Sequence, residues 1–271
     1  MEFNGKTVLI TGGASGIGKI MGRKAIERGA ETLIIWDINK DGIEKVKKEF
    51  SHLEAKVVGY QVDVSNVEEI QKIASQTKSE VGDVDILINN AGIVVGSYFH
   101  EHSHQDITQS MVINSNAYMH IALEFLPQMM ERNSGAICNI CSSASLISNP
   151  KMSVYAASKW AAAGWSDSLR LEMKALKKDV SVTTMMPYYI NTGMFDGVKS
   201  RVPLIKPEKA ARKIVRSIEK KRTIVSMPWS MQFVRFSQGI LPVKAFDWLM
   251  DNILGIYNTM DEFTGRVKKS E

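Results

Sequence analysis

The sequence has few cysteines. Cys138 and Cys141 are the only two among 271 residues. Their C-x-x-C spacing is typical of redox and metal sites. However, both lie in the apolar run 136–141, which predicts a buried strand, and residues three apart on a strand point to opposite faces. A metal site also needs further ligands that converge on the ion. We therefore assign these cysteines no redox or metal role.

The sequence also lacks long apolar runs. No stretch of 18 or more apolar residues occurs, and residues 1–6 lack the charged head and apolar run of a secretory signal. We therefore expect a cytoplasmic protein. The composition, 44% hydrophobic and 23% charged, is that of an ordinary globular protein.

The excess of positive charge is not concentrated in a nucleic-acid-binding motif. The net charge is +5, but the basic residues are scattered among 29 acidic ones. The local clusters at 206–221 and 266–269 fit solvated helix faces. We therefore expect no nucleic-acid partner.

Apolar, β-branched runs alternate with helical patterns along most of the chain. Seven strands are predicted, at 7–11, 32–36, 56–60, 84–88, 136–141, 180–186 and 223–226. Between them lie amphipathic segments such as 17–28 and 67–81, the second with Ser65 and Glu68 as a capping box. The pattern predicts an α/β, doubly wound Rossmann fold with a seven-stranded, mainly parallel sheet and helices on both faces. Because no repeat or Gly/Ser-rich linker interrupts it, we expect a single domain over 1–271, with an apolar and aromatic C-terminal extension at about 227–271.

A glycine-rich loop follows the first predicted strand. It reads Thr11-Gly12-Gly13-Ala14-Ser15-Gly16-Ile17-Gly18 and leads into a helical segment. Glycines allow a tight turn and a close approach of the backbone to a pyrophosphate, whose charge the amides at the helix N-terminus face. This context predicts a dinucleotide site, whereas a glycine run alone would indicate only a flexible loop.

Asp37 ends the second predicted strand, 19 residues after Gly18. An acid at this distance typically binds a ribose 2′-hydroxyl and repels a 2′-phosphate. Neither Ser15 nor Ile38 offers a cation for that phosphate. The cofactor predicted is therefore NAD; the alternative is a surface Asp at the start of the next helix.

Tyr155 and Lys159 share one face of a helix expected to run to about Ala175. A nearby ammonium stabilises a phenolate, so we expect Lys159 to lower the pKa of Tyr155 and make it a proton shuttle. As a lone pair they would indicate only a surface helix. Ser142, at the end of the fifth strand, and Asn89-Asn90-Ala91-Gly92, after the fourth, should meet them at the same sheet edge.

These motifs together resemble the short-chain dehydrogenase/reductase family, in its compact single-domain branch. T-G-x-x-x-G-x-G, N-N-A-G, the serine and Y-x-x-x-K occur in order within about residues 3–226. The run 36–40 and the tail resemble the retinol and 17β-hydroxysteroid dehydrogenase subgroup, which acts on lipophilic alcohols.

The resemblance implies roles for individual residues. Tyr155 would be the general acid/base, Lys159 would bind the nicotinamide ribose, and Ser142 would hold the substrate oxygen. Asn114 would support a water that exchanges protons with Lys159, although Asn116 is a neighbouring alternative. The remaining cofactor contacts expected are Gly12, Ser15, Gly16, Ile17, Gly18, Asp37, Asp63, Val64, Asn90, Ala91, Gly92, Ile190 and Thr192. One departure is Tyr188, which stands after Pro187 where the family has glycine, and it leaves the path of this loop open.

Two further features have competing interpretations. His100, His102 and His104 flank Glu101, but Ser103 looks like a helix N-cap with Asp106, which would separate the histidines; we expect no metal. The aromatic C-terminal segment fits a lid, a subunit contact, a weak membrane-surface contact or extra core, and we favour a lid or an interface. Small residues at 161–164 predict a homodimer or homotetramer.

The function predicted is hydride transfer between NAD(H) and a secondary or lipophilic alcohol or ketone, such as a steroid, retinoid or fatty alcohol. One alternative is a 3-oxoacyl reductase that uses NADPH, against which Asp37 argues. Another is a non-catalytic NAD(H) sensor, against which Tyr155, Lys159 and Ser142 argue. The substrate itself is not specified, because the loops at 94–104 and 194–205 can vary without affecting the chemistry.

Overall fold

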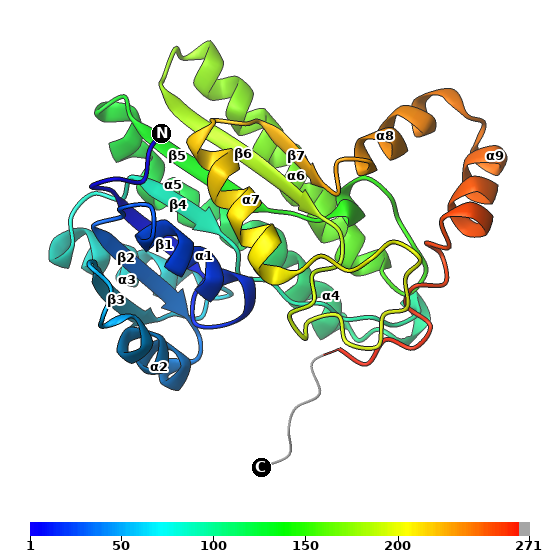
Figure 1. Ribbon diagram of the computed structural model, residues 1–271, viewed down its shortest axis with the longest axis horizontal. Helices are drawn as coiled ribbons and strands as arrows, with labels where there is room; N and C mark the ends of the chain where they lie inside the picture. Colours follow the sequence, from blue (N-terminus) through cyan, green and yellow to red (C-terminus); the bar gives the residue numbers. More distant parts are fainter. Residues whose placement is uncertain (266–271) are drawn as a thin grey trace.

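Seven parallel strands form one sheet in the order β3-β2-β1-β4-β5-β6-β7 (Figure 1). The computed structural model describes residues 1–265, so the basic cluster at 266–269 lies outside the described residues. The strands are β1 (Thr7–Thr11), β2 (Thr32–Asp37), β3 (Lys56–Gln61), β4 (Ile86–Asn89), β5 (Gly135–Ile140), β6 (Val180–Pro187) and β7 (Ile224–Met227). The predicted doubly wound Rossmann fold is confirmed, and every strand pair is parallel. Most predicted strand bounds agree within one residue, but β4 begins two residues late.

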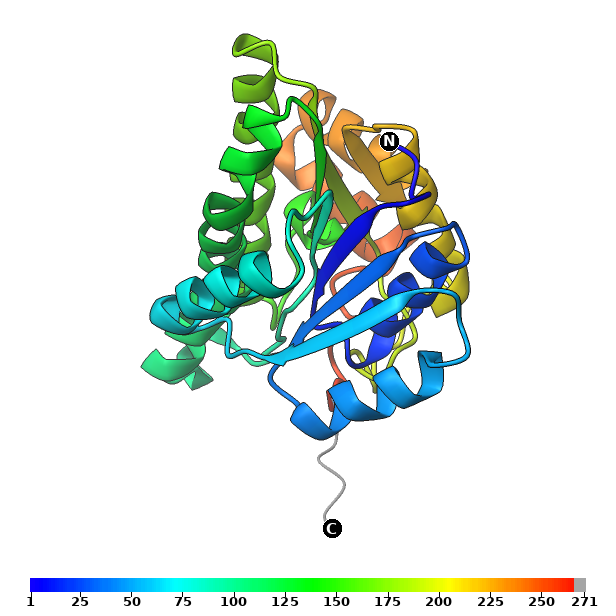
Figure 2. The ribbon, with the colours of Figure 1, turned by 90° about the vertical axis from the view of Figure 1, so that its left-hand side faces the viewer.

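Helices cover both faces of the sheet (Figure 2). Their bounds are α1 (Gly16–Ile26), α2 (Lys40–Phe50), α3 (Val67–Glu80), α4 (His104–Met111), α5 (Ala117–Glu131), α6 (Ser153–Ala175), α7 (Pro207–Glu219), α8 (Met231–Ile240) and α9 (Val243–Trp248). One apolar core lies between the sheet and α1, α2 and α7, and a second between the sheet and α3, α5 and α6. Because both faces are buried, the strands are nearly continuous apolar runs.

Side-chain caps determine where several helices begin. Asn39 caps α2 by accepting a hydrogen bond from the Gly42 amide at 2.9 Å. The cap predicted for α3 is wrong: Asn66 accepts from the Glu69 amide at 3.0 Å, while the Ser65 hydroxyl donates to Asp63. At α4 the predicted capping box of Ser103 and Asp106 is present.

The order of the strands places a crevice at one sheet edge. From β1 the chain first builds outward through β2 and β3 and then returns to β4 on the other side of β1. The loops after β1 and β4 therefore diverge to opposite faces at the carboxyl edge, which is where open α/β sheets bind ligands.

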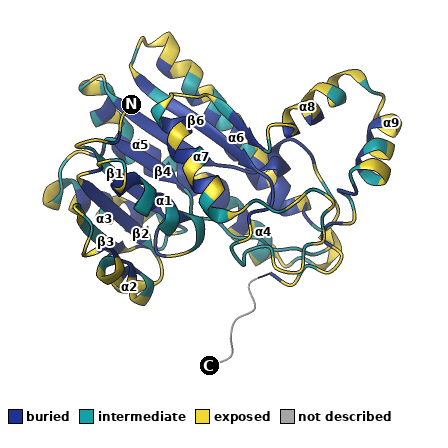
Figure 3. Cartoon of the chain, viewed as in Figure 1, coloured by how far each residue is buried: buried dark blue, intermediate teal, exposed yellow. Residues whose placement is uncertain are grey.

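Residues after β7 form an irregular layer with α8 and α9 beside the carboxyl end of the sheet (Figure 1). Their buried side chains join a third apolar core that includes Tyr155 and Tyr189; from this segment come Met231, Val234, Phe246, Met250, Ile256 and Met260. Much of the outer surface of α8 and α9 is exposed (Figure 3). Among the described residues no helix combines the length and apolarity needed to cross a bilayer.

Candidate active site

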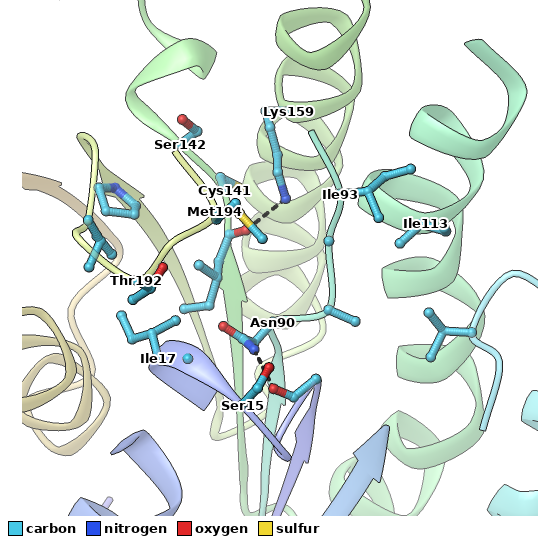
Figure 4. A pocket seen from close by; sticks show the side chains of 18 of the residues that line it. Ser15, Ile17, Asn90, Ile93, Ile113, Cys141, Ser142, Lys159, Thr192 and Met194 are labelled. Atoms are coloured by element: carbon cyan, nitrogen blue, oxygen red, sulfur yellow. Dashed lines mark hydrogen bonds between the residues drawn. The ribbon is translucent and has the colours of Figure 1, made fainter. Parts of the chain in front are cut away.

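A cavity of about 350 Å³ lies at the carboxyl edge of the sheet, where the strand order reverses. The glycine loop with Ser15 and Ile17 lies at one end beside Asn90, and Ser142 and Lys159 lie farther along (Figure 4). Of the predicted site residues, all but Gly18 and Asn114 line this cavity. The fold therefore brings together side chains from segments up to 180 residues apart.

The glycine loop has the backbone that a phosphate cradle requires. Gly12 and Gly16 have φ values of +64° and +52°, a left-handed backbone conformation that residues other than glycine rarely adopt. Gly18 lies under the loop, where a Cβ would be 2.1 Å from the Gly12 carbonyl oxygen. Its role is thus to allow α1 to pack against the loop. The first amides of an α-helix have no acceptor within the helix, and at the start of α1 they border the cavity, which fits a pyrophosphate.

Asp37 is held in a fixed orientation at the end of β2. Its Oδ2 accepts a hydrogen bond from the Ala14 amide at 2.9 Å, and its Oδ1 accepts from the Asn39 amide at 3.0 Å. Asp63 also lines the cavity, and its Oδ1 accepts from the backbone and hydroxyl of Ser65. The carboxylate of Asp37 thus presents negative charge where a ribose would lie.

Asn90 joins the glycine loop to the loop after β4. Its Nδ2 donates to the carbonyl oxygens of Thr11 at 2.9 Å and Gly12 at 3.2 Å. In return, the Thr11 hydroxyl accepts from the amides of Asn90 and Ala91 at 2.9 and 3.0 Å. These bonds fix the separation of the two loops. From the sequence Thr11 was recognised only as the first residue of the glycine motif, although a threonine that ends a buried strand needs a hydrogen-bond partner.

Lys159 extends from α6 into a buried polar pocket. Its Nζ donates to the Tyr118 hydroxyl and to the Ile140 carbonyl oxygen, both at 3.1 Å. Tyr118 is 1% exposed, and its hydroxyl donates toward the carbonyl oxygens of Ala91 and Ile140 at 3.1 Å. Burial lowers the pKa of Lys159 to about 8. Tyr118 was not predicted as a site residue; the signal in the sequence was a hydroxyl on the apolar face of α5, which requires a partner.

Tyr155 lies one helical turn before Lys159, as predicted, and is 5% exposed. The Lys159 Nζ is 5.9 Å from the centroid of its ring. The expectation that Lys159 lowers the pKa of Tyr155 is wrong for this structure: burial dominates and raises that pKa above its ordinary value, with the Ser142 hydroxyl opposing the shift. Desolvation of the phenolate is the largest contribution to this shift because the Tyr155 side chain is almost fully buried.

Ser142 and Asn114 occupy different kinds of position. Ser142 lines the cavity two residues beyond β5, with its Oγ accepting from the Ala144 amide at 3.1 Å. Asn114 lies in η2 (Val112–Asn116), a π-helical turn of the kind enriched at functional sites. Its side chain is fully buried and bonds to the backbone of Ile93 and the hydroxyl of Ser158. That side chain therefore positions the loop after β4.

The loop after β6 accommodates Tyr188 without a left-handed backbone, since its φ is not positive. The Tyr188 hydroxyl bonds to Ser200 at 2.8 Å, and its amide donates to the Met227 carbonyl oxygen. Ile190 and Thr192 still reach the cavity. Two aromatic residues that the sequence analysis missed lie beside the phenol: Phe195 packs edge-on against Tyr155, and Tyr189 against Phe195.

The cavity wall carries little charge. Asp37, Asp63 and Lys159 are the only charged residues among the described residues that line it. Apolar and aromatic side chains also line the cavity, among them Ile93, Tyr189, Met194 and Phe195, and Phe195 packs against Tyr155. Over residues 1–265, no group of His, Cys, Asp and Glu side chains is arranged to hold a metal ion.

Comparison with known proteins agrees with this arrangement. The profile of the short chain dehydrogenase family matches residues 6–202. Over 272 residues the chain is 37% identical to epidermal retinol dehydrogenase 2 of Mus musculus, covering 98% of this chain and 87% of that protein. It is 34% identical to estradiol 17-beta-dehydrogenase 11 of Pongo abelii, covering 90% of this chain and 81% of that one.

A solved structure shares the fold. A short chain dehydrogenase/reductase from Burkholderia phymatum, crystallised in complex with NAD, superposes with a TM-score of 0.81 at 24% identity, covering 88% of this chain and 95% of that chain. The chain belongs to the short chain dehydrogenase family and is an oxidoreductase that acts on a small molecule. The resemblance found in the sequence is thereby confirmed, including its subgroup.

Proposed function

We propose that the protein transfers hydride between NAD(H) and a lipophilic secondary alcohol or its ketone, with Tyr155 as general acid/base. The observation that carries this proposal is one cavity that holds Asp37 at one end and Ser142, Tyr155 and Lys159 at the other. A dinucleotide that extends along the cavity from Asp37 would end beside the tyrosine.

Each residue of the site would have a separate role in the reaction. The nicotinamide ring, when bound, would supply or accept the hydride. Tyr155 would give a proton to the carbonyl oxygen in reduction and take it back in oxidation, while Ser142 holds that oxygen within reach. Lys159 would bind the ribose with its ammonium, which Tyr118 and Ile140 orient. Asn114 supports the loop that carries Gly92, since its Oδ1 accepts from the Ile93 amide.

Asp37 supports a preference for NAD over NADP. Its carboxylate would repel a 2′-phosphate, and no lysine or arginine lines this end of the cavity among the described residues. The same scarcity of cations argues against a 3-oxoacyl thioester, whose carrier bears phosphate groups. A lipophilic substrate agrees with the apolar wall near Tyr155 and with the similarity to proteins named retinol and estradiol dehydrogenases.

An NADH-formation screen tests the proposal. Retinol, hydroxysteroids, simple secondary alcohols and 3-hydroxyacyl thioesters would each be tried with NAD and NADP. We expect turnover with NAD on a retinoid or steroid alcohol, and loss of at least three orders of magnitude in Tyr155→Phe with NADH binding retained. A protein that binds NADH but turns over nothing, with Tyr155→Phe indistinguishable from wild type, would instead be a sensor.

The assembly and cellular location remain part of this proposal. An outward stripe on α6, which includes Trp160, Gly164 and Leu171, is exposed and offers a surface for a homodimer or homotetramer. Light scattering at micromolar concentration checks this, because a monomeric mass would contradict it. A cytoplasmic location is checked by cell fractionation.

A further inference from the structure

The exposed apolar side chains of the protein are concentrated in one segment. Of the fourteen large hydrophobic residues exposed in the described part of the chain, seven fall within residues 229–253. These are Trp229, Phe233, Phe236, Ile240, Val243, Trp248 and Ile253, each at least 53% exposed. Single exposed apolar residues are normal, but a cluster of large ones marks an interaction surface.

Three of these residues form a stripe on α8, and a fourth extends it from the turn before the helix. Phe233, Phe236 and Ile240 recur at intervals of three and four residues, so they share one side of α8. Trp229 lies in the turn before the helix. We name these four residues the aromatic stripe. The rings of Trp229 and Phe233 pack edge-on with centroids 5.4 Å apart. Met231 and Val234, on the opposite side, are buried in the third core. The stripe therefore faces outward from an anchored helix (Figure 3).

A groove rich in positive charge adjoins the stripe. Lys213, Arg216, Lys220 and Arg222 line it, with Trp229 on its wall, and no acidic residue lines it. We name these four cations the basic groove. Lys213 is held close to other cations, and burial, Arg222 and Lys209 together lower its pKa. A cation crowded by like charges is stabilised by an external anion.

The nearby carboxylates are engaged by other partners. Glu208 and Glu219 of α7 form ion pairs with Arg23, Lys24 and Arg28. Asp247 and Asp251, near α9, accept hydrogen bonds only from the neutral groups of Tyr257 and Asn258 and keep their charge, but neither lines the groove. None of the basic groove's cations forms an ion pair within the described residues. Lys213 donates one hydrogen bond to the Ser226 carbonyl oxygen at 3.0 Å, but an ammonium has three donors, so all four cations can bind an external anion.

We infer that the aromatic stripe and the basic groove together form a docking surface for an anionic phospholipid bilayer. Tryptophan and phenylalanine insert favourably at the boundary of headgroups and acyl chains, and basic residues beside them bind the phosphate and carboxylate groups above. No part of α8 needs to cross the bilayer. This inference does not depend on the proposed reaction, since none of these residues lines the active-site cavity.

Vesicle sedimentation tests the inference. The full-length protein would be mixed with vesicles of phosphatidylcholine alone or of phosphatidylcholine with phosphatidylserine. We expect binding to the anionic vesicles, at least tenfold weaker binding to the neutral ones, and weakening by salt. A blue shift of tryptophan fluorescence on binding would report the insertion of Trp229.

Matched variants separate the two parts of the surface. Arg216→Gln with Lys220→Gln should weaken binding to anionic vesicles roughly tenfold or more, because each cation contributes to attraction. Lys45→Gln with Lys48→Gln, exposed cations on α2, should leave it unchanged. Phe233→Ser with Phe236→Ser should weaken insertion, whereas Trp160→Ser on α6 should not. Thermal unfolding checks that each variant is folded.

Two results would overturn the inference. One is the absence of binding to either type of vesicle by the folded wild-type protein. The other is an oligomer that dissociates when Phe233 and Phe236 are replaced, while vesicle binding is absent or unaffected, because the stripe would then cover a second copy of the chain.

Discussion

The hydrogen bond between Lys159 and Tyr118 leads to a quantitative prediction for Tyr118→Phe. The Tyr118 hydroxyl donates toward the carbonyl oxygens of Ala91 and Ile140, so its lone pair faces the Lys159 Nζ at 3.1 Å and stabilises the ammonium. A hydrogen bond to a buried charged group contributes about 1.5 kcal/mol at the lower end of its usual range. We use this lower value because Lys159 in the variant still has the Ile140 carbonyl oxygen as an acceptor.

This energy corresponds to a displacement of the lysine pKa by about one pH unit. Burial places that pKa at about 8 in the wild type, so we expect about 7 in Tyr118→Phe. Carbonyl reduction needs Tyr155 protonated and Lys159 charged. Because the pKa of Tyr155 is raised, Tyr155 stays protonated through this range. The descending limb of kcat/KM should therefore belong to Lys159.

The assay is the pH dependence of kcat/KM for NADH-linked reduction of retinal or estrone, whichever is turned over. Wild type and Tyr118→Phe should agree within about twofold near pH 6, differ by about fivefold near pH 8 and approach a tenfold difference above about pH 9. Tyr60→Phe removes a phenol that bonds to Glu80 away from the site and is the control. Coincident descending limbs, or a uniform loss at every pH, would refute the reasoning.

Three further predictions rest on single observations. Asp37→Ser combined with Ile38→Arg should raise the ratio of kcat/KM for NADPH to that for NADH by about a hundredfold, because the repulsive carboxylate is removed and a cation for the 2′-phosphate is added. Ile38→Arg alone is the control. An unchanged ratio in the double variant would argue against the assigned ribose contact. Lys159 has a pKa lowered from 10.5 to about 8, so the unfolded state binds the extra proton between these values and stability rises with pH across that window. Relative to Lys159→Met, the wild type should gain up to about 3 kcal/mol between pH 8 and 10.5 in denaturant titrations, and parallel curves would contradict the burial argument. Gly18→Ala should cost about 2 kcal/mol or more, because its Cβ would meet the Gly12 carbonyl at 2.1 Å, whereas Gly239→Ala meets no atom within 4 Å and should be neutral or slightly stabilising.

Much of the fold and the main site motifs were predictable from local patterns. The strands are apolar runs because both faces of the sheet are covered, and this makes them visible without any structure. Gly12 to Gly18, Asp37, Asn90 and Ser142 lie where strands end, and parallel strands bring such ends to one edge. The spacing of Tyr155 and Lys159 likewise follows from helical periodicity.

The energetics of the site depended on contacts between distant segments. Tyr118 reaches Lys159 only because α5 and α6 pack beside each other, and the burial that raises the pKa of Tyr155 comes from Phe195, Tyr189 and the C-terminal layer. A desolvation cost belongs to an environment, not to a spacing in the sequence. The sequence alone therefore determined which of its motifs meet at the sheet edge. Only the tertiary structure decided their charge states and left the aromatic stripe of α8 facing outward.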